Sequence, residues 1–380
     1  MQFIKKVYLL SVLTGSVILS GPAHSEPANN SAQVNGVEVV FVLDTTGSMN
    51  GLIEGAKRKI WSIANTIVDQ NPDAKIKMGL VAYRDIGDDY VTKSFNLTTD
   101  IQGIYANLLT FEADGGGDAP ESVNEALDVA VTKQDWTSES SQQNVKRIIF
   151  LVGDEPPHMD YKHDRKYPVV LKDATQKGII VNAIQVDGTT ETTRYWKEIA
   201  KLGNGKYIAI PQDGGKVVDI ETPYDDEIIQ VQAALNNTVL AYGTKTRKVA
   251  VENKKDAYRA ATKSSAAEMS KYVNKSSKGA AVVTGKGDLV ADMNKGLKLE
   301  TIPEQELPEV MQKMDVEKRA IFIQEQNAKR IELAKTLKEK VEKRDAYVLE
   351  QKAKMQKAGK TKDSFDTVVE KMLSEQIKGK

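Results

Sequence analysis

Short apolar runs alternate with amphipathic stretches along the first half of the chain. The runs at 39–43 and 148–152 are apolar at every position, which is typical of strands covered by helices on both faces. The amphipathic stretches have helical spacing and separate most of these runs. The predicted order is strand, helix, strand, strand, helix, helix, strand, helix, strand, helix, strand, over residues 37–43, 52–68, 76–83, 91–97, 101–109, 122–131, 147–152, 169–177, 179–186, 192–202 and 206–210.

This order predicts an α/β domain over residues 36–212, with a doubly wound, mostly parallel sheet of the Rossmann-like type. One pair of strands, 76–83 and 91–97, is joined too closely for a helix between them. The connection contains Asp85-Ile86-Gly87-Asp88-Asp89, which indicates a hairpin. We therefore expect an antiparallel strand at one edge of the sheet.

Beyond Pro211 the pattern changes to long stretches rich in Lys, Glu, Gln and Ala, so residues 223–380 are predicted to be mostly helical. Turn-forming residues at 276–287 and 296–308 divide this region. We expect helices at about 223–274, 288–296, 305–357 and 363–378.

The role of these helices stays open at the level of sequence. The apolar positions of the longest helix do not keep a strict heptad, so it is a weak coiled-coil candidate. We expect these helices to fold back on one another or on the first half of the chain. The charged positions of the longest helix suit a solvent-exposed face, and a dedicated partner-binding surface is the alternative. Large apolar residues are scarce after Tyr242, which favours a helical region that unfolds independently of the first half.

The N-terminus has the features of a secretory signal. Lys5 and Lys6 precede an apolar run at 7–19, and Ala23-His24-Ser25 follows with small residues at the two positions that a signal peptidase reads. The run is shorter than the roughly 20 residues of a membrane-spanning helix. We therefore expect a signal peptide over residues 1–25, cleaved before Glu26, with an uncleaved anchor as the alternative. The mature protein would be periplasmic or secreted, without a transmembrane segment.

Composition narrows the possible partners and chemistry. The chain has no cysteine, which excludes disulfides and thiolate metal sites. Lys and Arg total 53, as do Asp and Glu, so no net field attracts nucleic acid. Phosphate-binding loops of the Gly-x-x-x-x-Gly-Lys-Ser/Thr type are missing from the sequence.

Oxygen-bearing side chains gather in loops that follow the buried strands, where ligands bind in sheets of this kind. The first loop is Asp44-Thr45-Thr46-Gly47-Ser48, in which Asp44, Thr46 and Ser48 alternate and so face one side of an extended segment. Such hard ligands suit Mg²⁺, with Mn²⁺ or Ca²⁺ as alternatives. Asp44 or Thr46 as a simple helix cap is the competing interpretation.

Two further acidic loops, 115–121 and 153–155, are expected at the same end of the sheet. They contribute Asp118 and Glu121 from the first and Asp154 from the second. Carboxylates brought together repel one another unless a cation lies among them. The three loops together therefore predict a divalent metal ion.

These residues resemble the von Willebrand factor type A family over about residues 36–212. Asp44-Thr45-Thr46-Gly47-Ser48 is similar to the family's Asp-x-Ser/Thr-x-Ser metal-ion-dependent adhesion motif, and Asp154 follows the fourth strand. The resemblance implies that Thr46 and Ser48 bind the ion directly, while Asp44 and Asp154 act mostly through water. It also implies one coordination position open to an acidic residue of a protein partner.

The second loop resembles that of integrin beta subunits, in which an Asp-x-Pro-Glu sequence supplies a glutamate. Asp118-Ala119-Pro120-Glu121 matches it, so the resemblance implies Glu121 as the ligand and Asp118 as its neighbour, with a second ion as an alternative role for Asp118. The aspartate pair that follows the second serine in integrins is replaced by Gly51 and Leu52. The segments 83–85 and 154–158 are also similar to the type A domain joined to some alpha-kinases, but no kinase follows.

The sequence thus favours an exported, non-enzymatic adhesion or scaffold protein that recruits a protein partner through a metal ion. Asp44, Glu121 and Asp154 bring three negative charges against a dication, which weakens capture of a further carboxylate. A subunit in which the metal only ties the loops together is therefore an alternative. A hydrolase using His158 is the other, although His158 and His163 share a loop that we expect to be solvated.

Overall fold

The computed structural model describes residues 34–117, 119–138, 144–187, 189–211, 220–276, 281–357 and 365–378. The predicted signal peptide and Asp118 lie outside these ranges, so both remain predictions. Across the described residues, no helix is long and apolar enough to cross a membrane.

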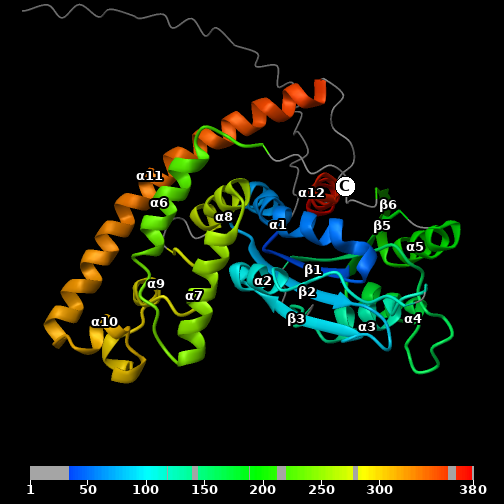
Figure 1. Ribbon diagram of the computed structural model, residues 1–380, viewed down its shortest axis with the longest axis horizontal. Helices are drawn as coiled ribbons and strands as arrows, with labels where there is room; N and C mark the ends of the chain where they lie inside the picture. Colours follow the sequence, from blue (N-terminus) through cyan, green and yellow to red (C-terminus); the bar gives the residue numbers. More distant parts are fainter. Residues whose placement is uncertain are drawn as a thin grey trace, which may run out of the picture. The chain divides into compact units, whose positions relative to one another are not determined.

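A six-stranded sheet forms the centre of the first half, in the order β3-β2-β1-β4-β5-β6 (Figure 1). All neighbouring strands are parallel except β2 and β3, which pair antiparallel at the edge. The predicted α/β fold and its antiparallel edge strand are therefore confirmed. The strands are β1 Gly36–Asp44, β2 Lys75–Tyr83, β3 Thr92–Thr98, β4 Val145–Gly153, β5 Ile179–Val186 and β6 Asn204–Ile210.

Strand β1 shows why continuous apolar runs form the middle of this sheet. All nine of its residues are buried. Val39 and Phe41 pack into one hydrophobic cluster, whereas Val40 and Val42 pack into a second. Successive side chains of a strand point to opposite faces, so a strand covered on both sides must be apolar at each position.

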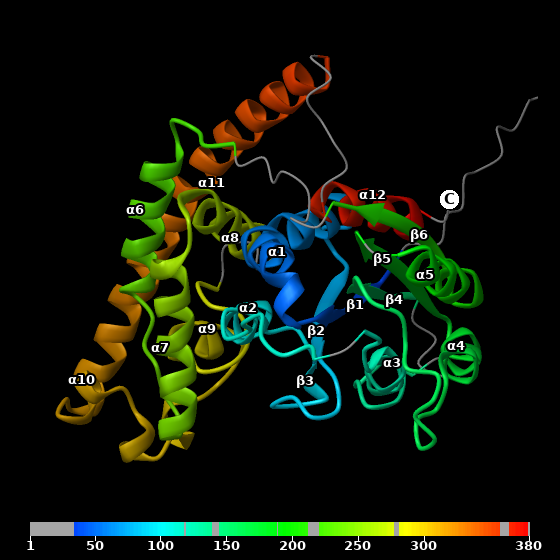
Figure 2. The same ribbon diagram turned by 45° about the vertical axis from the view of Figure 1, so that its right-hand side comes forward.

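Helices cover both faces of the sheet (Figure 2). The first cluster joins β1 to α1 (Asn50–Gln70) and α2 (Ile101–Leu108). The second joins it to the opposite helical layer. That layer consists of α3 Val123–Thr132, α4 Tyr167–Gln176 and α5 Thr190–Leu202.

The last helix of the chain, α12 (Phe365–Ile377), belongs to the layer of α1. The Phe365 ring lies 6.3 Å from that of Phe41, and Val369 and Leu373 continue the same buried face at helical spacing. Its far end is fixed by Gln376, which donates to Asn182 at 2.7 Å and accepts from it at 3.1 Å. A segment far beyond residue 212 thus completes the cover of the sheet.

The second half is helical, as predicted, but the prediction of one long helix at its start is wrong. The expected helix 223–274 is three helices, because the chain turns at Gly243, whose φ is +98°, and again at Thr262. The Thr262 hydroxyl accepts the backbone N–H of Ser265 at 3.2 Å and so begins the third helix. The α-helices are α6 Asp225–Asn236, α7 Lys245–Ala260, α8 Lys263–Ser276, α9 Leu289–Asn294, α10 Glu309–Gln312 and α11 Val316–Lys357, with 3₁₀ turns at Leu299–Thr301 and Glu304–Glu306.

Helix α8 packs on the sheet domain through aromatic rings. Trp61 of α1 lies between Tyr105 of α2, at 5.4 Å, and Tyr272 of α8, at 5.5 Å. All three are buried in the cluster that contains β1. The expectation of an independent helical arm is therefore wrong in structural terms, because α8 and α12 share the core of the first half.

Buried arginines join the remaining helices to this core. Arg344 of α11 donates to Asp225 of α6 at 2.8 Å and to Glu268 of α8 at 2.6 Å. Arg330 of α11 forms a second buried pair with Asp288, at 2.7 Å. Such charges are costly to bury unless each is paired, so these contacts fix the position of α11.

Candidate functional site

The candidate site lies at the carboxyl ends of β1 and β4, which are adjacent and parallel. Asp44 ends β1 and Gly153 ends β4, so the loops that follow start at the same edge of the sheet. Glu121 is brought there by a short parallel bridge to Pro157. Its backbone N–H donates to Pro156 at 2.9 Å, and its carbonyl accepts from the N–H of His158 at 3.1 Å.

The first loop gathers its three oxygen-bearing side chains as the alternation predicted. Asp44 Oδ1 accepts from the backbone N–H of Thr46 at 2.9 Å and from its hydroxyl at 2.7 Å. The Thr46 hydroxyl lies 3.4 Å from that of Ser48. Neither the 3₁₀ turn Gly47–Met49 nor α1 has a side-chain cap, so the capping interpretation is wrong.

The glycine-rich second loop packs directly against the first. The N–H of Gly47 donates to the carbonyl of Gly115 at 3.2 Å, and that of Asp114 donates to Thr45 at 3.1 Å. Gly116 has a φ of +85°, and a Cβ there would lie 3.1 Å from Cβ of Thr46 and 3.4 Å from Oε1 of Glu121. Glycine is required at this position both for its conformation and for the close approach.

The carboxylates of the site are buried, and those of Asp44 and Glu121 each have one oxygen without a hydrogen bond to the described residues. Asp44 is 0% exposed, Glu121 2% and Asp154 5%. Within the described residues, Asp44 Oδ2 and Glu121 Oε2 have no hydrogen-bond partner. Buried polar atoms are nearly always paired, so two such oxygens in one site point to a ligand.

Burial and mutual repulsion shift the titration of two of these groups. Burial, followed by the charge of Asp154, raises the pKa of Asp44 to about 7. Burial, followed by the charge of Asp44, raises the pKa of Glu121 to about 9. Both shifts have the sign expected for carboxylates that lack a neighbouring cation.

The described residues do not form a set of direct carboxylate ligands. The described part of the chain contains no group of three or more His, Cys, Asp or Glu side chains placed to hold a metal together. The donor set is instead mixed, since the hydroxyls of Thr46 and Ser48 lie beside the carboxylates. Such a set fits a hard dication whose carboxylates act partly through water.

Two residues that support the site were not identified from the sequence. Tyr83 lies opposite Asp44 in the β1–β2 register, and burial together with the charge of Asp44 raises the pKa of its phenol. Arg84 donates to the carbonyl of Thr45 at 3.2 Å and to that of Glu112 at 3.0 Å. The guanidinium of Arg84 therefore ties the first loop to the start of the second.

The histidine loop is also different from the expectation. His158 is buried, its ring stacks on Tyr161 at 3.8 Å, and its Nε2 lies 3.3 Å from Asp85 Oδ2. Asp85 in turn accepts from the hydroxyls of Ser122 and Tyr161, each at 2.7 Å. The prediction of a solvated loop is thus wrong for His158, which packs beside the segment that positions Glu121. His163 is exposed, as predicted.

Comparison with known proteins gives one family and a set of similar folds. A family model described as von Willebrand factor A domain matches residues 38–222. No curated protein matches the sequence. The crystal structure of the SpRpn10 VWA domain is similar, with 15% identity and a TM-score of 0.35, over 47% of this chain and 89% of that one.

Two structures of proximal thread matrix protein 1 from the mussel byssus are also similar. Each has 15% identity and a TM-score of 0.34, over 47% of this chain and 43% of that protein. This chain therefore spans less than half of the length of the byssus protein. One of the two structures is described as having a zinc-occupied MIDAS motif.

Proposed function

Because residues 38–222 of this chain belong to the von Willebrand factor A domain family, we propose that it binds a protein partner through a divalent metal ion at the loops described above. Domains of this family serve protein interaction or adhesion, which is the general role of the chain. The metal, its residues and the export of the protein are the proposed refinements.

One observation supports the metal above all others. Asp44 Oδ2 and Glu121 Oε2 are buried oxygens without hydrogen-bond partners among the described residues. A cation between them would stabilise both ionised forms and remove the repulsion that raises their pKa values. The hard oxygen donors favour Mg²⁺, with Mn²⁺ or Ca²⁺ as alternatives.

Each residue has a proposed role at the ion. Thr46 and Ser48 bind it through their hydroxyls, Glu121 through its carboxylate, and Asp44 and Asp154 supply charge mostly through water. The bound ion offers one further position to an acidic residue of the partner. Arg84 holds the first and second loops together, and the packed helices set the orientation of the whole domain.

The predicted signal peptide places this interaction outside the cytoplasm, in the periplasm or beyond the cell. The partner we propose is accordingly a protein of the same compartment, and neither nucleic acid nor a membrane span takes part. Catalysis has little support, because the His158 ring is packed between Tyr161, Asp85 and Asp160. A general base must lie within hydrogen-bond reach of the proton that it removes, whereas the His158 ring is buried and its two nitrogens face the carboxylates of Asp85 and Asp160.

Calorimetry tests the metal site directly. Mg²⁺ titrated into EDTA-treated, desalted full chain should bind, whereas the Asp44→Ala variant should give no binding heat. His158→Ala is the matched control, because the His158 ring pairs with Asp85 and Asp160 and is not among the proposed ligands. Equal loss of binding in both variants would move the metal to the histidine loop.

Partner capture from envelope extract, in Mg²⁺ and again in EDTA, tests the function of the ion. A protein retained by the wild type in Mg²⁺, and lost both in EDTA and with Thr46→Ala, would support metal-dependent recognition. Metal binding that stabilises the fold but changes no interaction would instead identify a structural ion, the alternative raised by the negative charge of the site.

A further inference from the structure

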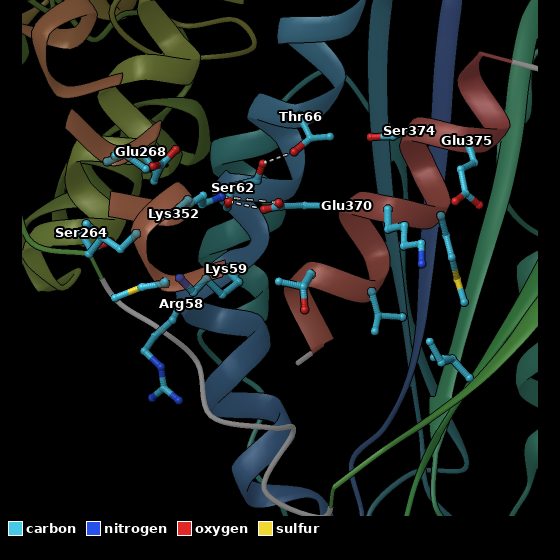
Figure 3. A pocket seen from close by; sticks show the side chains of 18 of the residues that line it. Arg58, Lys59, Ser62, Thr66, Ser264, Glu268, Lys352, Glu370, Ser374 and Glu375 are labelled. Atoms are coloured by element: carbon cyan, nitrogen blue, oxygen red, sulfur yellow. Dashed lines mark hydrogen bonds and ion pairs between the residues drawn. The ribbon is translucent and has the colours of Figure 1, made fainter. Parts of the chain in front are cut away.

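A cavity lies between elements from both halves of the chain, at α1, α8, the end of α11, α12 and β6. Its volume is about 830 Å³, within the range of sites that enclose small molecules. In Figure 3 Ser62 of α1 and Glu370 of α12 reach toward each other, while Arg58 extends from α1 away from this contact. The hydroxyl of Ser62 donates to Glu370 at 2.5 Å.

Positive charge exceeds negative charge in the lining. Among the described residues that line the cavity there are six basic side chains and three carboxylates, which gives this part of the lining a net charge of +3. Partners within the protein already occupy each carboxylate: Glu268 pairs with Arg344 at 2.6 Å, Glu370 with Lys352 at 3.7 Å, and Glu375 with Lys206. The basic residues are Arg58, Lys59, Lys206, Arg344, Lys352 and Lys371.

Arg58 is the cation best placed to receive a ligand. Its side chain is half-buried and forms no ion pair with any described residue. A guanidinium presents parallel N–H donors that match the two oxygens of a carboxylate. An anion at Arg58 would therefore gain a charge-assisted contact without displacing an existing pair.

The remaining wall of the cavity is apolar. The side chains come from β6, from the last turns of α11, from α12 and from the segment before α6. A ligand that carries charge along its whole length would leave the apolar side chains exposed to water. An uncharged ligand would form no ion pair with the excess basic side chains. The apolar lining residues are Ile208, Ile220, Val348, Met355, Val368 and Met372.

We propose that this cavity binds a single-chain anionic amphiphile of the fatty-acid class. The carboxylate lies at Arg58, and the chain lies along the apolar wall between α11 and α12. Binding would hold together elements that come from both halves of the molecule. The proposal is independent of the metal site, so each can fail without the other.

Calorimetry of the full chain with dodecanoate, octanoate and dodecyltrimethylammonium, each below its micelle concentration, tests the proposal. Dodecanoate should bind most tightly, with affinity rising roughly fourfold for each added methylene. The cation of equal chain length should bind at least tenfold more weakly. The heats should be the same in Mg²⁺ and in EDTA, which separates this site from the metal.

Charge reversal at the cavity gives the matched comparison. Arg58→Glu should weaken dodecanoate binding at least tenfold, whereas Arg259→Glu, on an exposed side chain outside the cavity, should leave it unchanged. Lys371→Glu, on the exposed side of α12, provides a second variant if Arg58→Glu does not fold. No binding of dodecanoate, equal binding of the cation, or equal effects of Arg58→Glu and Arg259→Glu would overturn the proposal.

Discussion

Asp44 and Glu121 make the metal-free protein sensitive to pH. Their pKa values rise on folding, from 3.8 to about 7 and from 4.5 to about 9. The folded state therefore binds these two protons more tightly than the unfolded state does. The resulting contribution to the free energy of unfolding is complete below pH 4 and is lost as the pH rises through about 7 and then about 9. In EDTA, we expect the melting temperature to fall by several degrees between pH 5 and pH 9.

Two controls separate this fall in melting temperature from the titration of other groups in the protein. Saturating Mg²⁺ should reduce the fall, because a cation favours the ionised carboxylates. The double variant Asp44→Asn with Glu121→Gln should show little of it, since neither side chain titrates. Scanning calorimetry of the three samples provides the measurement, and identical profiles in EDTA for the wild type and the double variant would contradict the assignment.

The second loop offers two acids for one role. Glu121 forms backbone hydrogen bonds to Pro156 and His158, so the position of its backbone is fixed. We expect Glu121→Ala to weaken Mg²⁺ affinity at least tenfold in calorimetry, and Asp118→Ala to weaken it less. The reverse order would show that the integrin-like alignment of this loop is wrong.

The sequence predicted the proposed metal ligands better than the residues that hold those ligands in place. Asp44, Thr46 and Ser48 alternate within one segment, so their common direction follows from local geometry alone. Arg84 and His158 act through contacts with loops distant along the chain, which no local pattern encodes. The acidic group therefore could be predicted, but the burial of His158 could not.

At the scale of elements, the close contact between the first and second loops depends on Gly116. Alanine there would adopt a positive φ and place its Cβ 3.1 Å from that of Thr46. We expect Gly116→Ala to cost about 1–3 kcal/mol and to weaken Mg²⁺ binding about tenfold. Gly117→Ala is the matched control, because its Cβ would meet nothing within 4 Å. Denaturant titration and calorimetry would show the difference, and equal effects would argue against the packed loop.

Strands and helices differed in how well their limits could be predicted. Each buried strand is a short apolar run between polar loops, so its ends are marked in the sequence. Gly243 marks the first of the turns that divide residues 223–274, whereas the second lies in Ala260-Ala261-Thr262-Lys263, where alanine and lysine favour a continued helix. Tertiary contacts mark the actual ends: Arg330 of α11 donates to the carbonyl of Thr238 at 2.9 Å, just beyond the end of α6.

For the whole molecule, the shared core determines how it unfolds. Phe365, Val369 and Leu373 of α12 are buried with residues of β1 and α1, and Tyr272 of α8 packs beside Trp61. The scarcity of large apolar residues after Tyr242 did not reveal this, because the few that exist are placed against the first half. Composition measures how many apolar residues there are, but not which surface they cover.

We therefore expect one thermal transition for the full chain. Mg²⁺ should raise its temperature because only the folded state binds the ion, and the free energy of unfolding should increase by about 2.7 kcal/mol at a Mg²⁺ concentration 100 times Kd.

Val369→Asp, at a fully buried position of α12, should lower the stability of the whole molecule by about 3 kcal/mol or more. Leu349→Asp, at a position of α11 that is 72% exposed, should change it by less than about 0.5 kcal/mol. Scanning calorimetry would distinguish one shared transition from the two transitions of an independent helical arm. In the second case, Val369→Asp would shift only the transition whose temperature does not depend on Mg²⁺.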